Sequence, residues 1–195
     1  YHDYPNLGLK YAKWTGLTWE KQTVDKIDEA GLDTSIALDT SNYSHISYFD
    51  LTNGTLKYAQ WTGSYWKIET VDAGGLGMYT SILLDTNNNP HISYYDYTNG
   101  DLRYAKWTGL YWKIQTVDKT DDVGMYTSIA LDTTNCPHIS YYDATNGSLR
   151  YAKWSDEIAA WGTITGTISY IGPKSGNLYY AAFGNAEFKG EPIAT

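Results

Sequence analysis

Apolar and polar residues alternate along most of this chain in short runs of five or six residues. In the segment 34–39, Ile36 and Leu38 fall on one face, and the segments 45–50 and 56–61 alternate in the same way. A period of two with many β-branched and aromatic residues predicts β-strands. No stretch of useful length has the period of a helix, so we expect an all-β protein.

The predicted strands belong to a repeat with copies 46 or 47 residues apart. The run Leu-Lys-Tyr-Ala-Lys-Trp-Thr-Gly at 9–16 returns with small changes at 56–63 and 102–109, and a fourth copy begins at Leu149. Each unit predicts four short strands joined by turns, and four-stranded units of this length form the blades of β-propellers. We therefore expect residues 1–160 to form a β-propeller of about four four-stranded blades, from units near 9–55, 56–101, 102–148 and 149–160.

The order of strands in a blade predicts which residues lie near the propeller axis. The segment 80–85 is expected to be innermost, because its alternate small residues suit a crowded centre, and 112–117 is expected at the outer edge. The loops before the innermost strands, 73–79 and 119–126, vary most between units, and variable loops on a rigid scaffold usually carry specificity. The candidate ligand-binding residues in these loops are Tyr79, Tyr126, Asp121 and Asp122.

The two ends of the sequence match internal parts of the repeat. Residues 1–9 align without gaps with 94–102, so the first blade is expected to lack its first strand. Residues 168–181 match 92–105, which suggests that 161–195 is a degenerate copy that completes the first blade. The ring is therefore expected to close through this tail, to stay open, or to pair with a second chain.

Composition excludes several classes of function. The 195 residues carry a net charge of −8 without a cluster of Lys and Arg, so we expect no nucleic-acid partner. No apolar run approaches the roughly 18 residues that a spanning helix needs, so we expect no membrane span. Cys136 is alone, which excludes an internal disulfide framework and a paired-cysteine zinc site. The abundance of Tyr, Thr, Asn and Gly favours an extracellular or cell-surface location.

The unit His-Ile-Ser-Tyr-Tyr-Asp-Tyr-Thr-Asn-Gly-Asp-Leu-Arg-Tyr-Ala-Lys-Trp-Thr-Gly-Leu-Tyr-Trp at 91–112 carries a family resemblance. Over about residues 1–154 the chain resembles propeller-type repeats of bacterial and archaeal cell-surface and secreted proteins. The resemblance implies propeller blades outside the cell, and it implies no particular activity. Residues 161–195 look like the opening of a carboxypeptidase-regulatory-like β-sandwich, which is an alternative to the closing copy.

Three histidines and two sets of aspartates recur at the same place in successive units. A residue that is present in every unit is more simply structural than catalytic, so we expect His45, His91 and His138 to be packed or hydrogen-bonded. The aspartates are expected to bond the backbone of the turns that they begin. A calcium ion is the alternative, since carboxylate and amide oxygens are its ligands, and the weak candidates for it are Asp85, Asn87 and Asp132.

Tryptophans flank the same four-residue hairpin loop in three units. Cross-strand aromatic pairs stabilise hairpins, and this is the structural interpretation. Alternatively the indoles are platforms on which sugar rings stack, and repeated weak sites would then gain avidity. The candidates are the pairs Trp14 and Trp19, Trp61 and Trp66, and Trp107 and Trp112.

These features favour a non-catalytic extracellular or cell-surface module, without a cofactor, that binds glycans or a surface protein. The first alternative is a self-assembling subunit of a surface layer or filament, a homo-oligomer formed by strand exchange. The second is a glycosidase- or lyase-like propeller enzyme, which the sequence disfavours because it has no nucleophile elbow and no Arg cluster for a carboxylated sugar.

Overall fold

The computed structural model describes residues 1–3, 8–26 and 29–154, and these residues form β-strands, turns and short connections. These ranges contain no helix, and therefore none long and apolar enough to cross a membrane. The segment 161–195, predicted as a closing copy or part of a sandwich, lies outside the described residues. The strands are β1 (His2–Asp3), β2 (Gly8–Trp14), β3 (Trp19–Asp25), β4 (Ala30–Leu38), β5 (Ser44–Asp50), β6 (Thr55–Trp61), β7 (Trp66–Ala73), β8 (Leu76–Leu84), β9 (Pro90–Asp96), β10 (Asp101–Trp107), β11 (Trp112–Asp118), β12 (Val123–Leu131), β13 (Pro137–Asp143) and β14 (Ser148–Lys153).

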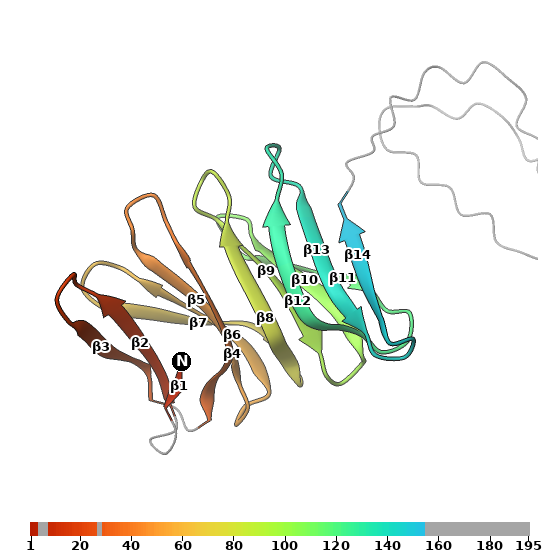
Figure 1. Ribbon diagram of the computed structural model, residues 1–195, viewed down its shortest axis with the longest axis horizontal. Coiled ribbons are helices and arrows are strands. Elements are labelled where there is room, and N and C mark those ends of the chain that lie inside the picture. Colours follow the sequence, from red (N-terminus) through yellow and green to blue (C-terminus); the bar gives the residue numbers. More distant parts are fainter. Residues whose placement is uncertain (4–7, 27–28, 155–195) are drawn as a thin grey trace, which may run out of the picture. The chain divides into compact units, whose positions relative to one another are not determined.

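The strands form four antiparallel sheets that follow one another in chain order (Figure 1). The second sheet, β4–β7, and the third, β8–β11, are complete four-stranded meanders. The first sheet contains β1–β3, which correspond to the second, third and fourth strands of a unit, and the described part of the fourth contains β12–β14. The fold is therefore of the β-propeller type, with four-stranded blades, as the repeat predicts. We call the sheets the first to fourth blades.

The first strands of successive blades lie beside one another. β8 packs between β4 and β12, whereas β7 and β11 form the opposite edges of their sheets. Hydrogen bonds join the inner strands, since the Ile82 amide donates to Ser35 Oγ at 3.1 Å and the Ile129 amide donates to Ser81 Oγ at 3.3 Å. The prediction that 80–85 is innermost and 112–117 outermost is confirmed.

The inner strands begin earlier than the sequence predicts. β8 starts at Leu76 and not at 80, and β12 starts at Val123, so Tyr79 and Tyr126 belong to strands and not to loops. Two register shifts interrupt the pairing of β8 with β9, between Leu76 and Ser81. Such bulges insert extra residues and break the period of two from which the strand was predicted.

The apolar core lies at the junctions between blades. One cluster joins Leu56, Tyr58 and Val71 of the second blade to Ile82, Ile92, Tyr94 and Ala105 of the third, and equivalent clusters occupy the junctions before and after it. Every residue of β5 and of β9 is buried. β5 and β9 are therefore covered on both faces.

A buried polar network crosses each junction. At the second junction, Asp72 at the end of β7 accepts hydrogen bonds from the Tyr94 hydroxyl at 2.7 Å and from Arg103 Nη1 at 3.1 Å. Arg103 Nε lies 2.9 Å from Asp96, which is fully buried. The other two junctions repeat this arrangement with Asp25, Tyr48, Lys57 and Asp50, and with Asp118, Tyr141, Arg150 and Asp143.

Glycine allows the inner strand to approach the preceding blade. Gly77 has a φ of +113°, and a Cβ atom there would lie 2.8 Å from the Cα of Leu56. Gly124 meets Leu102 in the same way, at 2.8 Å with a φ of +112°. The junction is therefore closed by a backbone contact that no side chain can replace without displacing a blade.

We expect Gly77→Ala to lower the free energy of unfolding by about 3 kcal/mol, because it combines left-handed strain with overpacking against backbone. The matched control is Gly109→Ala, which has a φ of +94° and no atom within 4 Å of the new Cβ, and which should cost about 1 kcal/mol. Urea denaturation of both variants measures the difference. Equal losses in the two variants would contradict the close junction.

Candidate binding site

Four tyrosines from two adjacent blades gather near the start of the inner strands. The rings of Tyr79 on β8 and Tyr126 on β12 have centroids 4.5 Å apart. Tyr95 on β9 lies 6.1 Å from Tyr79, and Tyr142 on β13 lies 6.3 Å from Tyr126. We call these four residues the tyrosine cluster. Tyr126 is 67% exposed and Tyr142 is 37% exposed, so ring surface is open to a ligand.

The backbone holds the two central tyrosines in an unusual conformation. Tyr79 has a φ of 52° and Tyr126 a φ of 51°, in the left-handed region. This region costs a bulky residue about 1–2 kcal/mol, whereas Asp and Asn enter it more readily. The second blade has Asp33 at the same position, with a φ of 47°. Because the repeat accepts the more tolerant residue there, the fold does not require tyrosine at this position.

Carboxylates adjoin the tyrosine cluster. The Tyr95 hydroxyl donates to Asp122 Oδ1 at 2.6 Å. The pKa of Tyr95 is raised mainly by burial and, to a smaller extent, by this hydrogen bond. Burial, then Tyr126 and the charge of Asp33, raise the pKa of Tyr79. Both phenols therefore keep their protons at neutral pH and remain hydrogen-bond donors. The amide of Asp122 donates in turn to Thr145 Oγ1 at 3.1 Å, which ties the loop to the neighbouring Asn-Gly turn.

The structure thus brings together three of the four residues proposed from the variable loops. Tyr79 contacts Tyr126, and Asp122 reaches the cluster through Tyr95, while Asp121 lies beside Asp122 with an exposed side chain. Sequence reasoning missed Tyr95 and Tyr142. The available signal was that both are the second tyrosine of Ser-Tyr-Tyr-Asp, at the end of the strand next to the innermost one.

The tryptophan pairs lie at the other end of the strands. Trp14 and Trp19, Trp61 and Trp66, and Trp107 and Trp112 face each other across their hairpins, with centroids 5.4–5.6 Å apart. In β10, Lys106 next to Trp107 pairs with His91, whereas Leu102 pairs with Tyr95 near the tyrosine cluster. The tryptophan pairs and the tyrosine cluster are therefore separate surfaces.

Two of these indoles also contact the preceding blade. Trp66 Nε1 donates to Gln22 at 3.1 Å, and its ring meets Tyr11 edge-on at 5.3 Å. Trp112 Nε1 donates to Glu69 at 3.3 Å, and its ring meets Tyr58 at 5.2 Å. These contacts account for both tryptophans as packing residues of the junctions, without a ligand.

The three repeated histidines lie between a tyrosine and an aspartate. His91 Nδ1 is 2.6 Å from the Tyr104 hydroxyl, and its Nε2 is 3.6 Å from Asp85 Oδ2. Burial lowers the pKa of His91 to about 4, so the ring is neutral at pH 7, accepts from Tyr104 and directs Nε2–H towards Asp85. His45 and His138 have the same neighbours in their own blades. The expectation of hydrogen-bonded structural histidines is confirmed.

The aspartates bind the turns that they begin. Asp85 Oδ1 accepts from the amides of Asn87 and Asn89 at 2.8 Å, and Oδ2 accepts from the Asn89 side chain at 3.1 Å. Asp132 bonds the amides of Thr134 and Cys136 in the same way. Backbone amides thus occupy Oδ1 of two of the calcium candidates, Asp85 and Asp132. Within residues 1–3, 8–26 and 29–154, no group of three or more His, Cys, Asp or Glu side chains could hold a metal ion.

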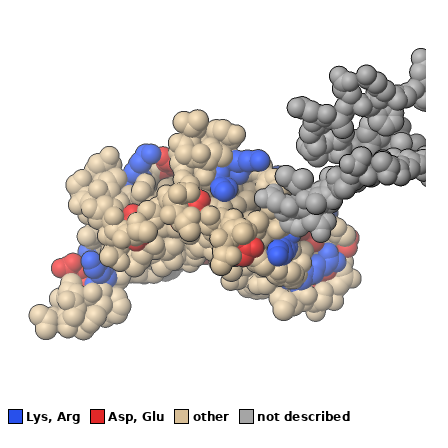
Figure 2. Space-filling view, turned by 90° about the horizontal axis from the view of Figure 1, so that it is seen from above, with Lys and Arg blue, Asp and Glu red and all other residues tan. Residues whose placement is uncertain are grey.

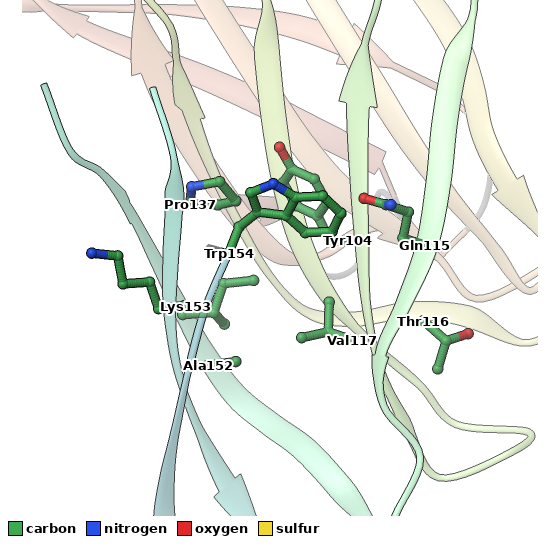
Figure 3. Close-up of a pocket in the computed structure, with 9 residues that line it drawn as sticks. Tyr104, Gln115, Thr116, Val117, Pro137, Ala152, Lys153 and Trp154 are labelled. Carbon is green, nitrogen blue, oxygen red and sulfur yellow. The ribbon is translucent and has the colours of Figure 1, made fainter. Parts of the chain in front are cut away.

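A pocket of about 260 Å³ lies between the third and fourth blades (Figure 3). It is lined by Tyr104, Gln115, Thr116, Val117, Pro137, Ile139, Ala152, Lys153 and Trp154. At the two preceding junctions the tyrosine that corresponds to Tyr104 is covered by the fourth-strand tryptophan of the next blade, Trp66 or Trp112. The residues of the fourth unit that correspond to these tryptophans lie outside the described residues, so we assign no ligand to this pocket.

Charges of both signs are interspersed on the surface. Figure 2 shows Lys and Arg side chains in small separate groups among Asp and Glu, over one face of the molecule. The chain as a whole carries a net charge of −8. On the face shown, the basic side chains therefore form no broad basic region.

Comparison with known proteins gives one structural likeness to report. No protein-family model matches the chain, and no curated protein matches it. Among solved structures, a bifunctional GH43-CE protein of Bacteroides eggerthii aligns with a TM-score of 0.47 and 10% sequence identity. The alignment covers 75% of this chain and 22% of the other, so the chain spans about a fifth of that protein's length. At these values the likeness decides nothing about function.

The buried histidines predict an acid-sensitive fold. The pKa of His91 is about 4 in the folded protein and near 6.5 in the unfolded chain, so the unfolded chain binds more protons as the pH falls. As the pH falls from 6.5 to 5, before the carboxylates titrate, we expect proton uptake at His91 in the unfolded chain to reduce the free energy of unfolding by about 1–2 kcal/mol. Urea titrations of the wild type and of His91→Gln test this, since the variant should be less stable at pH 7 and less dependent on pH. Identical slopes would refute it.

Proposed function

We propose that this protein is a non-catalytic module that binds glycans outside the cell, and that the tyrosine cluster is its binding site. One observation carries the proposal, namely two bulky tyrosines with ring centroids 4.5 Å apart, both in a strained backbone conformation that the repeat does not require. Strained residues that the surrounding structure maintains tend to occur at binding and catalytic sites.

The chemistry of the cluster suits a sugar. Pyranose rings present flat C–H faces, which pack against aromatic rings, and hydroxyl groups, which need hydrogen-bonding partners. Tyr126 offers exposed ring surface, and Asp122, which accepts a hydrogen bond from the Tyr95 hydroxyl, offers carboxylate oxygens as acceptors for sugar hydroxyl groups. The inner strands that carry the rings are joined by hydrogen bonds across the junctions, so little conformational freedom is lost on binding.

A protein partner is the other class of ligand that such a surface accepts. Tyrosine is enriched in protein interfaces because it has one apolar face and one hydrogen-bonding end. We prefer the glycan because the cluster contains only four rings on two blades, an area that matches a few sugar units better than a protein interface.

We expect Tyr126→Ala to weaken glycan binding about 10-fold, the equivalent of about 1.4 kcal/mol, through loss of stacking. Tyr126→Phe should keep the affinity within about threefold, because the ring remains. A glycan array identifies the ligand, and isothermal titration calorimetry then measures each variant.

The matched control is Tyr111→Ala. Tyr111 is 60% exposed but lies in a tryptophan hairpin at the other end of the strands, so its removal should leave binding unchanged. If Tyr111→Ala and Tyr126→Ala reduce binding equally, or if the array retains no protein, the assignment of the tyrosine cluster as a glycan site is wrong.

A further inference from the structure

The tyrosine cluster is surrounded by negative charge. Asp33 is exposed and lies near Tyr79, at the same position of the preceding inner strand. On the other side, Asp122 accepts a hydrogen bond from Tyr95. Asp121 directly precedes Asp122 in the loop and has an exposed side chain and a φ of 71°. One carboxylate, Asp122, is therefore bonded to the cluster, Asp33 lies on the adjoining inner strand, and Asp121 adjoins Asp122 in the chain.

The Lys and Arg side chains of the junction networks are already paired with carboxylates. Lys57 lies between Asp25 and Asp50. In the same way Arg103 lies between Asp72 and Asp96, and Arg150 lies between Asp118 and Asp143. Lys119, in the loop that carries Asp121, interacts with Asp101 at the start of β10. The carboxylates at the cluster thus remain uncompensated by the network cations.

Aromatic rings and carboxylates attract the same kind of group. The face of a tyrosine ring carries partial negative charge and binds cations, with about 0.5–2 kcal/mol per contact. A nearby carboxylate adds attraction that is screened by salt. A neutral sugar gains only stacking and hydrogen bonds from such a surface, and a uronic acid is repelled by it.

We propose that the tyrosine cluster selects a saccharide that carries a protonated amino group, such as a de-N-acetylated amino sugar, over its neutral and acidic counterparts. The inference rests on the proposed glycan site and adds the charge of the ligand to it. The sugar ring stacks on Tyr126, and its ammonium group lies towards Asp33 or towards Asp121 and Asp122.

Three tetrasaccharides with the same β-1,4 linkage test the inference, because they differ mainly at the second carbon. They are the tetramers of glucosamine, N-acetylglucosamine and glucose, measured by calorimetry at pH 6 with the full chain. We expect the glucosamine tetramer to bind about 10-fold more tightly than the glucose tetramer, and the difference to shrink in 0.5 M NaCl.

The matched variants are Asp33→Asn and Asp121→Asn. Asparagine tolerates the left-handed conformation as aspartate does, so the variants remove charge and keep the backbone. We expect the double variant to reduce the preference for the glucosamine tetramer over the glucose tetramer to less than about threefold. Glu20→Gln, on β3 in the first blade, is the control and should leave the preference intact.

The outcomes separate this inference from the proposed function. Equal binding of the three tetramers, or a preference for the acetylated one, overturns the inference and leaves a glycan site standing. Failure of all three to bind overturns both for this class of sugar. A tetralysine peptide that binds as tightly as the glucosamine tetramer also overturns the inference, because the site would then recognise charge without the sugar.

Discussion

The contact between consecutive blades is the constraint on which the rest of the structure depends. Each junction joins an aspartate of one blade to a tyrosine and a Lys or Arg of the next, above an apolar cluster. Leu149 shows how much burial this contact supplies. It is 80% exposed in the fourth blade, whereas its counterparts Leu56 and Leu102, covered by the following blade, are fully buried. A blade therefore has little core of its own, and folding requires its neighbour.

The same constraint creates the candidate site. Gly77 and Gly124 bring the inner strands against the preceding blade, and the bulges that follow place Tyr79 and Tyr126 side by side. The site therefore depends on a register that the junction maintains. Variation at one position of the bulge, from Asp33 in the second blade to tyrosine in the next two, changes the surface without changing the scaffold.

The sequence predicted the architecture well because its signals are local and repeated. The strands, the paired tryptophans and the turn-binding aspartates all follow from spacing within one unit. The contribution of Arg103 to the junction could not be predicted, because it depends on Asp72 of another blade. The start of β8 was misplaced because Gly77 and Tyr79 break the alternation. Tyr95 was missed because the bulge between β8 and β9 places it beside Tyr79, and the alternation of residues does not predict that bulge.

A double-mutant cycle across one junction tests the central claim most directly. Asp72→Ala and Tyr94→Phe each remove one side of the contact between β7 and β9, and the free energy of unfolding is measured for both variants and for the pair. We expect a coupling energy of about 1–2 kcal/mol, because a partly buried, charge-assisted hydrogen bond is lost in either single variant. Additive effects within about 0.5 kcal/mol would contradict it, since the two blades would then be held together without this network.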